Sequence, residues 1–263
     1  MPYLGYLLAQ AVKAGQTVAS AITSAASYVT RVGSSVVELS ASAEALKSPS
    51  NGSALFNGTS DRIVMGNVHD QGASNATYMY WMYSTEQDTG QAVIAKSNGG
   101  AFTTSYGYLL GVQSGGLIYY FTADSDGSTH NSNITHPGLN KWYHIAFSVD
   151  KSKTKVDIYV DGNLQSVSNS GSLSAIGNVT NSLNFVIGDE TDGASTHNFG
   201  GNLANVAVWS RVLTAEEIRS VMMKSYDDLS ASETKGLVSW YALDDISGTT
   251  VPDSHGNFNG TAY

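Results

Sequence analysis

Residues 141–162, KWYHIAFSVDKSKTKVDIYVDG, decide the fold of this chain. The segment YHIAFSVD, residues 143–150, alternates its large apolar side chains with smaller or polar ones, and a period of two is the period of a β-strand. The apolar side chains that share one face are Tyr143, Ile145, Phe147 and Val149. The alternation resumes after the turn-forming KSK in VDIYV, residues 156–160. The stretch therefore predicts a β-hairpin.

A second turn follows this hairpin directly. Asp161 and Gly162 form a pair that tolerates positive φ angles and favours a tight turn. The sequence therefore predicts a third strand that passes through Leu164.

The same alternation recurs on both sides of the hairpin, with clusters of Gly, Asn and Asp between the runs. Further strands are predicted at about 62–65, 77–84, 91–96, 106–112, 117–123, 184–188, 202–209 and 237–243. So many short strands predict an all-β, two-sheet antiparallel sandwich.

One short helix interrupts the pattern, because Thr214 and Glu217 form a capping box ahead of an apolar stripe. We expect it to cover an end of the sandwich.

The composition of the chain argues against one class of binding partner, nucleic acid. Its 263 residues include 13% charged residues, a net charge of −9 and no cysteine. A negative chain repels phosphate backbones, and no run of Lys or Arg offsets this, so nucleic acid is not an expected partner. Because the chain has no cysteine, no disulfide stabilises the fold. The lack of cysteine fits several cellular compartments and does not select one.

The amino-terminal segment 1–47 has a different period. Its apolar and small residues are spaced alternately four and three apart, which predicts a helical segment that packs along a partner and anchors or oligomerises the protein. The positions in this pattern are Leu4, Leu8, Ala11, Gly15, Val18, Ile22, Ala25, Val29, Val32, Val36, Leu39, Ala43 and Leu46. The alternative is an Ala-rich apolar leader whose apolar residues would fit several secondary-structure patterns. No run of about 20 apolar residues predicts a membrane span.

Residues 48–53, SPSNGS, are the predicted linker because Pro and Gly end a helix. The sandwich is then expected from 54 to 263.

Five motifs in the sandwich occur in a recognisable order: ALFNGTSDRIV (54–64), KWYHIAFSVD (141–150), DIYVDG (157–162), FVIGD (185–189) and VWSRVLTAEEI (208–218). Together they resemble the laminin-G-like, concanavalin A-like jellyroll family across 54–223. The resemblance implies a jellyroll of two antiparallel sheets that binds glycans or proteins.

The tail GLVSWYALDDISGTTVPDSHGNFNG, residues 236–260, is similar to a segment that precedes the 54–64 motif in that family. Because the ends of a sandwich domain commonly lie close together, a terminal strand can be supplied from either end. We therefore expect a permuted arrangement in which residues 237–243 complete the sandwich beside the strand near Leu55. The alternatives are a truncated second repeat and a strand donated to a neighbouring subunit.

The sequence contains no convincing catalytic set. Glycoside hydrolases of this fold need two carboxylates on neighbouring strand positions, whereas Glu86 and Asp88 lie in a turn, and Glu216 and Glu217 begin a helix. No Gly-x-Ser-x-Gly motif is present either. We expect no enzyme, and a structural role for His144.

Calcium is the one candidate cofactor. The resemblance implies an ion near DSHGNFNG, with Asp253, Asn257 and Asn259 as candidate ligands. The family commonly has an Ile-Asp-Glu-Val stretch where this chain has LANV, residues 203–206, and thus lacks two carboxylates. The acidic loops 124–127 and 189–192 are more simply polar turns.

Tyrosines supply the predicted binding face. If Met79, Trp81 and Tyr83 point inward, the neighbouring tyrosines point outward, where ring faces stack on sugars. The candidate ligand-binding residues are Tyr78, Tyr80, Tyr106, Tyr108 and Tyr119. The alternative is that these rings cover the second sheet or a subunit interface.

These observations predict a non-enzymatic binding or structural protein, exported or on a virion surface. The favoured class is a virion decoration or fibre protein, in which residues 1–47 hold a homo-oligomer or a capsid or tail protein. The alternative is a secreted or cell-surface lectin-like module, and the third class is a glycoside hydrolase of the same fold.

Overall fold

The computed structural model describes residues 28–32, 35–39, 52–87, 89–99, 106–193 and 195–263. The chain divides into two compact units, 1–45 and 46–263. In the first unit the described residues form an antiparallel hairpin of β1 (Tyr28–Val32) and β2 (Ser35–Leu39). The helical prediction is wrong for these residues, because five of the ten are β-branched and favour extended backbone. The rest of the predicted helical segment lies outside the described residues.

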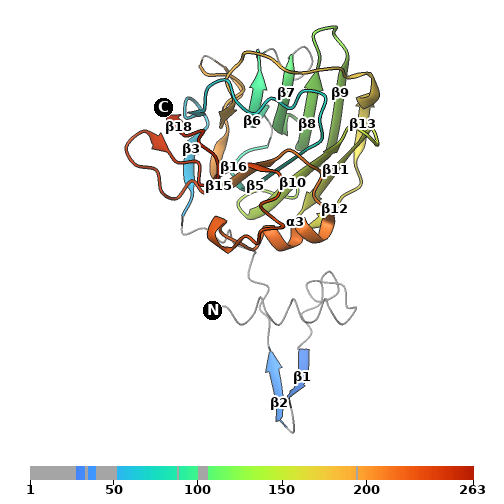
Figure 1. Cartoon of the computed structure of the whole chain (residues 1–263). Coiled ribbons are helices and arrows are strands. Elements are labelled where there is room, and N and C mark those ends of the chain that lie inside the picture. The colour runs from blue at the N-terminus through green and yellow to red at the C-terminus, as the bar shows by residue number, and fades with distance from the viewer. Residues whose placement is uncertain (1–27, 33–34, 40–51, 88, 100–105, 194) are drawn as a thin grey trace. The chain divides into compact units, whose positions relative to one another are not determined.

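The second unit is a sandwich of two antiparallel sheets, as predicted (Figure 1). Within the described residues, sheet I has the order β12-β11-β10-β5-β15-β16, with β3 also on β15, and sheet II has the order β13-β9-β8-β7-β6-β14-β4-β18-β17. The strands of sheet I are β3 (Ala54–Asn57), β5 (Ala76–Ser84), β10 (Trp142–Asp150), β11 (Lys155–Val160), β12 (Asn163–Leu164), β15 (Gly200–Trp209) and β16 (Leu237–Tyr241). Those of sheet II are β4 (Ile63–Val64), β6 (Gln91–Ser97), β7 (Gly107–Gln113), β8 (Leu117–Ala123), β9 (Thr129–Thr135), β13 (Ser168–Gly171), β14 (Val186–Ile187), β17 (Thr250–Val251) and β18 (Gly260–Ala262).

The hairpin and its second turn are confirmed. β10 pairs with β11 from Ile145↔Val160 to Asp150↔Lys155. Asp161 and Gly162 then adopt φ angles of 49° and 72°, and the turn leads into β12, where Asn163 pairs with Val160. The predicted apolar face of β10 lies in the core between the sheets, where each fully buried side chain contributes roughly 1.5–3 kcal/mol.

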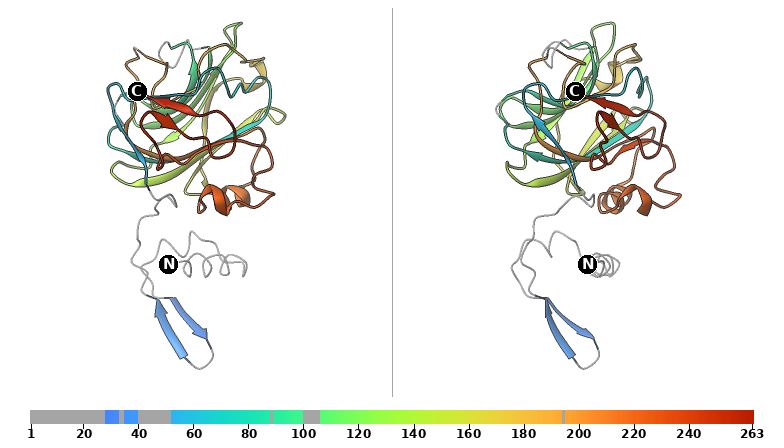
Figure 2. Two further views of the ribbon diagram at one scale, coloured as in Figure 1. Left: turned by 60° about the vertical axis from the view of Figure 1, so that its left-hand side comes forward. Right: turned by 90° about the vertical axis from the view of Figure 1, so that its left-hand side faces the viewer.

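The tail completes both sheets of its own chain. β16 pairs antiparallel with β15, from Val206↔Tyr241 to Trp209↔Leu237, and β18 pairs with β4 in sheet II. Figure 2 shows the C-terminal strands against the sandwich in two views. This placement contradicts a truncated second repeat, and the pairing with β15 needs no neighbouring subunit.

One detail of the permuted arrangement is corrected. β16 forms no ladder with β3; both strands pair with the same edge of β15, β3 along Gly200–Leu203 and β16 along Val206–Trp209. They lie end to end, and the ladder of β15 shifts register between them. Asn205, in this gap, has a φ of 48° and donates its N–H to the carbonyl of Ala242 at 3.1 Å.

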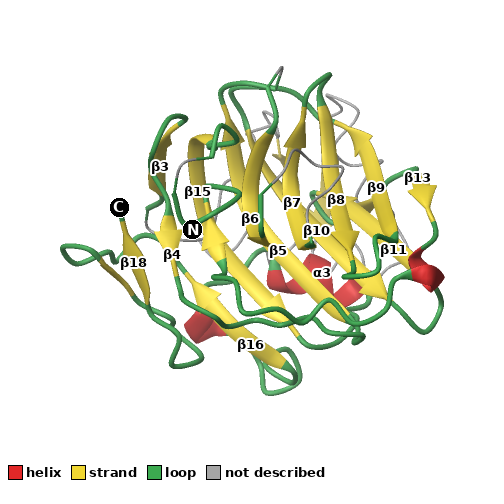
Figure 3. Ribbon diagram, turned by 90° about the horizontal axis from the view of Figure 1, so that it is seen from above, coloured by secondary structure: helices red, strands yellow, loops and turns green. Residues whose placement is uncertain are grey.

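The predicted helix is α3 (Ala215–Val221), and its Thr214–Glu217 capping box is confirmed. It packs on the outer face of sheet I (Figures 1 and 3). Two 3₁₀ helices, η1 (Leu173–Ala175) and η2 (Tyr226–Asp228), complete the described helices. Among the described helices, none is long and apolar enough to cross a bilayer.

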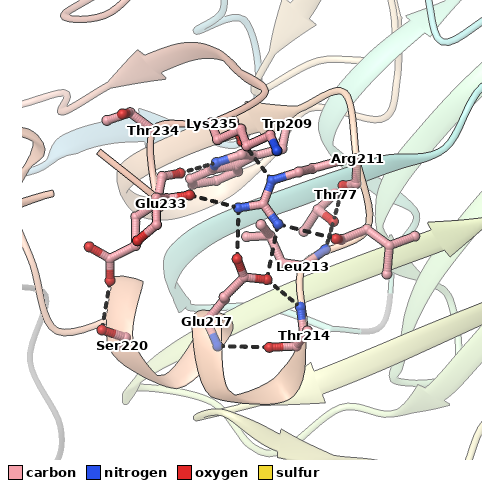
Figure 4. Close-up of polar contacts among 12 residues, drawn as sticks. Thr77, Trp209, Arg211, Leu213, Thr214, Glu217, Ser220, Glu233, Thr234 and Lys235 are labelled. Carbon is pink, nitrogen blue, oxygen red and sulfur yellow. Dashed lines mark hydrogen bonds and ion pairs between the residues drawn. The ribbon is translucent and has the colours of Figure 1, made fainter. Parts of the chain in front are cut away.

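A polar cluster fastens the strap, residues 224–236, that joins α3 to β16 (Figure 4). The carboxylate of Glu233 accepts hydrogen bonds from Ser220 Oγ, Lys224 Nζ and the backbone N–H of Ser230, at 2.6–2.8 Å. Although burial opposes it, hydrogen bonding lowers the pKa of Glu233 to about 2, so the group stays ionised. Arg211 adds bonds to the carbonyls of Ser232 and Lys235 and an ion pair with Glu217. The tail is thus held in place before β16 begins.

Candidate functional site

The faces of β5 place the aromatic side chains of sheet I. Tyr78, Tyr80 and Met82 point into the core between the sheets, whereas Met79 packs in the outer cluster beneath α3. The predicted orientation of this strand is therefore wrong by one residue. Because side chains alternate along a strand, such an error exchanges the two faces completely. Tyr83, predicted to point inward, lies on the outer face.

Successive cross-strand rows on this outer face differ in how far they are covered. The row of Ala207, Met79 and Ala146 lies beneath α3 in an apolar cluster with Ile218 and Val221. In the next row Trp81 is buried, and its indole Nε1 donates to the carbonyl of Met222 at 3.1 Å, just beyond the end of the helix. The third row is the candidate site.

This third row, which we call the aromatic row, consists of Leu55, Asn202, Tyr83 and Trp142 on β3, β15, β5 and β10. Each residue is the direct register partner of the next, so all four side chains share the outer face. The rings of Tyr83 and Trp142 have centroids 5.8 Å apart and planes inclined at 58°. Both rings are half-buried, and Leu55 is 71% exposed.

The aromatic row also carries polar groups. Asn202 Nδ2 donates to Ser53 Oγ at 3.2 Å. Among the described residues, Asn202 Oδ1, the Tyr83 hydroxyl and the Trp142 indole N–H form no hydrogen bond with another protein atom. The row therefore offers two ring faces beside free donors and acceptors on a rigid sheet, the arrangement that fixes and orients a sugar.

The sequence analysis missed Tyr83 and Trp142 as site residues. The signal for Trp142 was present, because it is out of phase with Tyr143, Ile145, Phe147 and Val149 and must lie on the opposite face. Tyr83 then follows from the pairing of β10 with β5, which the sequence did not reveal.

Three predicted ligand-binding tyrosines are core residues, which corrects their assignment. Tyr78, Tyr80 and Tyr108 are buried between the sheets. Tyr108 donates its hydroxyl to the carbonyl of His69 at 2.6 Å, and Tyr78 donates to Gln71 Oε1 at 3.3 Å. Burial raises the pKa of all three phenols, so they stay protonated. They cannot stack on a ligand from solvent.

The two remaining tyrosines lie on sheet II or beside it. Tyr119 is buried in an outer-face apolar cluster, stacked on Phe121 with centroids 6.0 Å apart, so its prediction as a surface ring is also wrong. Tyr106 is half-buried, and its hydroxyl donates to the carbonyl of Thr180 at 2.5 Å. None of the five predicted tyrosines belongs to the aromatic row.

The predicted calcium ligands form a hydrogen-bonded loop instead. Both carboxylate oxygens of Asp253 accept bonds, from Ser239 Oγ at 2.7 Å and Trp240 N–H at 2.9 Å, and from three backbone N–H groups of the loop. Asn259 Oδ1 accepts from Asp253 N–H, and Asn257 is exposed. Donors aimed at the same oxygens do not fit a cation, and no group of three acidic or His side chains within the described residues could hold one.

A pH dependence follows from histidines that the fold keeps neutral. Burial lowers the pKa of His144, beside Trp81, to about 3 and that of His69 to about 4, and shifts His130 and His136 downward. Below pH about 6.5 the unfolded chain binds protons that the folded chain does not. We expect the free energy of unfolding to fall between pH 6.5 and 5, by up to about 1.4 kcal/mol per pH unit for each such histidine.

Chemical denaturation at several pH values checks this prediction. His144→Gln should flatten the slope relative to the parent chain. Equal stability at pH 6.5 and pH 5 would contradict the assignment of neutral, buried imidazoles.

Comparison with known proteins adds three findings. A family model described as the concanavalin A-like lectin/glucanases superfamily matches residues 57–219. A candidate carbohydrate-binding protein from Bacteroides ovatus is 23% identical, with a TM-score of 0.57, over 80% of this chain and 57% of that chain. The CBM40 domain of the Ruminococcus gnavus IT-sialidase, bound to α2,3-sialyllactose, is 15% identical, with a TM-score of 0.46, over 67% of this chain and 100% of that chain.

Two curated relatives also match, and one of them illustrates both. The non-toxic nonhemagglutinin type A of Clostridium botulinum (strain Kyoto / Type A2) is 28% identical over 117 residues. The match covers 43% of this chain and 10% of the relative, so the chain spans about a tenth of that protein's length. At these identities the solved structures establish the fold alone.

Proposed function

Because the chain belongs to the concanavalin A-like lectin and glucanase superfamily, we propose that its sandwich is a non-enzymatic module that binds a carbohydrate on the aromatic row. The observation that carries the proposal is the Tyr83–Trp142 pair, two half-exposed rings side by side on a sheet face. The C–H face of a sugar ring packs on such rings, and nearby polar groups hold its hydroxyls.

The surroundings of the pair support a preformed site. Trp142 and Tyr83 lie on the two central strands β10 and β5, which pair along eight residues. The neighbouring row is fixed by the bond from Trp81 to Met222. Because these rings are already held in place, they lose little conformational entropy when a ligand binds. This favours the binding of a glycan, a class of ligand that binds weakly.

A binding role suits the Glu217 and Glu233 carboxylates better than hydrolysis. Glycosidases need one carboxylic acid whose pKa is raised and a second carboxylate close to it. Glu217 caps α3 and pairs with Arg211, and this hydrogen bonding lowers its pKa, while Glu233 fastens the strap. These groups are held ionised for structural reasons.

Alanine substitution in the aromatic row tests the proposal. The full chain is screened on an array of plant, bacterial and animal oligosaccharides, and the best binder is titrated by calorimetry. We expect Trp142→Ala and Tyr83→Ala each to weaken binding about tenfold or more, since ring anchors dominate such interfaces.

Tyr263→Ala is the matched control, because this exposed ring belongs to the far edge of sheet II beside Arg62. It should leave the affinity unchanged. Binding that survives the loss of both row rings would refute the site, and release of reducing sugar from the bound oligosaccharide would refute the non-enzymatic role.

A separate proposal concerns the location of the module and its attachment to other proteins. We expect export or display on a virion surface, with residues 1–47 attaching the sandwich to further copies or to a capsid or tail protein. Apart from the β1–β2 hairpin, that segment lies outside the described residues, so support rests on the apolar spacing of the rest of the segment. Co-assembly in fixed stoichiometry with a capsid or tail protein would favour the virion role over a lectin-like module of bacteria.

A further inference from the structure

The two rings of the aromatic row are inclined to each other, which limits the ligands that can stack on both. The centroids of Tyr83 and Trp142 lie 5.8 Å apart, and the ring planes are inclined at 58°. A flat surface can pack face to face on two rings only when their planes are nearly parallel. A ligand that packs on both rings must therefore present two apolar faces that are turned relative to each other.

Consecutive sugars of a twisted oligosaccharide meet this condition. Each sugar ring has an apolar C–H face, and in a helical chain each ring is rotated relative to the ring before it. The repeat of such a chain is close to the spacing of neighbouring strands, so one sugar can lie over Trp142 and the next over Tyr83. A flat ribbon such as cellulose presents parallel faces and packs on one of the two rings at a time.

The row continues beyond the ring pair. Its four residues lie on four adjacent strands, so three strand spacings, roughly 14 Å, separate Leu55 from Trp142. Next to Tyr83, the side-chain oxygen of Asn202 can accept a hydrogen bond from a hydroxyl, and Leu55, 71% exposed, offers an apolar contact. This length matches three consecutive sugars.

The neighbouring row fixes the direction of the chain. Its register partners Ala204, Trp81 and His144 are all buried. Trp81 Nε1 donates to the carbonyl of Met222, which lies just beyond α3. A sugar chain that ran along the strands would collide with the segment that covers this row. The exposed strip instead directs the chain across β10, β5 and β15.

Charge narrows the class of ligand further. None of the four row residues is charged, and the whole chain carries a net charge of −9, which repels carboxylate or sulfate groups on a glycan. We propose that the aromatic row binds three consecutive sugars of a neutral, twisted oligosaccharide that lies across the strands. This inference rests on the proposed carbohydrate-binding function and adds the length, shape and charge of the ligand.

The length is tested by calorimetric titration of the full chain with two to five sugars of one series, that of the best binder on the array. We expect the affinity to rise about tenfold or more from two sugars to three, and less than about twofold from four to five, because the row is then filled. A disaccharide that binds as tightly as the trisaccharide, or a best binder that carries carboxylates, would overturn the proposal. Binding of no oligosaccharide at all would instead refute the carbohydrate-binding function itself.

One row variant locates the third sugar. Asn202→Ala should reduce the gain in affinity from the third sugar to less than about threefold, whereas Tyr263→Ala, beside Arg62, should keep the full gain. An unchanged gain in Asn202→Ala would place the third sugar elsewhere and contradict the proposed path.

The shape is tested by sedimentation of the full chain with microcrystalline cellulose and with chitin, which present flat surfaces. The chain should stay in the supernatant with both. Cosedimentation that Trp142→Ala abolishes would show that the rings bind a flat surface, and a twisted ligand would then be wrong.

Discussion

Removal of residues 237–263 is expected to unfold the sandwich completely. The tail supplies β16 on the edge of β15 and β18 beside β4. It also buries apolar side chains at Leu237, Trp240, Tyr241, Leu243 and Val251. At roughly 1.5–3 kcal/mol each, these five contribute about 7–15 kcal/mol, as much as the whole net stability of a typical domain.

Circular dichroism and thermal melting of chains 1–263 and 1–236 measure this effect. The shorter chain should lack a cooperative transition, while Tyr263→Ala, a change at an exposed tail residue, should melt near the parent temperature. Trp240→Ala should fall between them, with a loss of about 3–5 kcal/mol for a buried Trp. A truncated chain that melts cooperatively at the parent temperature would contradict the structural role of the tail.

The second large effect is expected from Asp253→Ala, with a loss of about 3–5 kcal/mol in the free energy of unfolding. Five donors converge on this buried carboxylate, including Trp240 N–H and Ser239 Oγ, and removing an acceptor leaves buried donors unsatisfied. A Cβ at Gly256 would approach Asp253 Oδ2 to 2.5 Å, so Gly256→Ala should disturb the same loop.

Urea unfolding of the variant separates this role from that of a calcium ligand. Asp245→Ala, a nearby exposed carboxylate, should change stability by less than about 0.5 kcal/mol. Millimolar calcium should not stabilise the parent chain. A calcium-dependent rise in stability that Asp253→Ala abolishes would instead restore the predicted metal site.

The elements that the sequence predicted best have strong local signals. The β10–β11 hairpin alternates strictly, Asp161–Gly162 specifies the turn from β11 into β12, and the Thr214–Glu217 box specifies the start of α3. The tail was assigned to the sandwich from its motif. The predicted partner, the strand near Leu55, was wrong, because the choice between β3 and the open edge of β15 depends on tertiary packing.

Of the candidate site, Tyr83 could not be placed on the outer face from the sequence, because β5 carries no usable alternation. Its sequence ATYMYWMYS is almost wholly apolar and is buried on both faces, by sheet II on one side and by α3 on the other. A strand covered on both faces does not reveal which residues point where. β9, THNSNIT, was missed for the opposite reason, since His130 and Ser132 occupy buried positions that usually hold apolar residues.

Nuclear magnetic resonance of the four tryptophan indoles tests the aromatic row most directly. Trp81, Trp209 and Trp240 are at most 2% exposed, and Trp142 alone is half-buried. When the ¹⁵N-labelled full chain is titrated with its best-binding oligosaccharide, the Trp142 Nε1–H resonance should shift with the binding isotherm while the other three stay in place. A saturating titration that leaves the Trp142 resonance unmoved would show that the carbohydrate binds elsewhere.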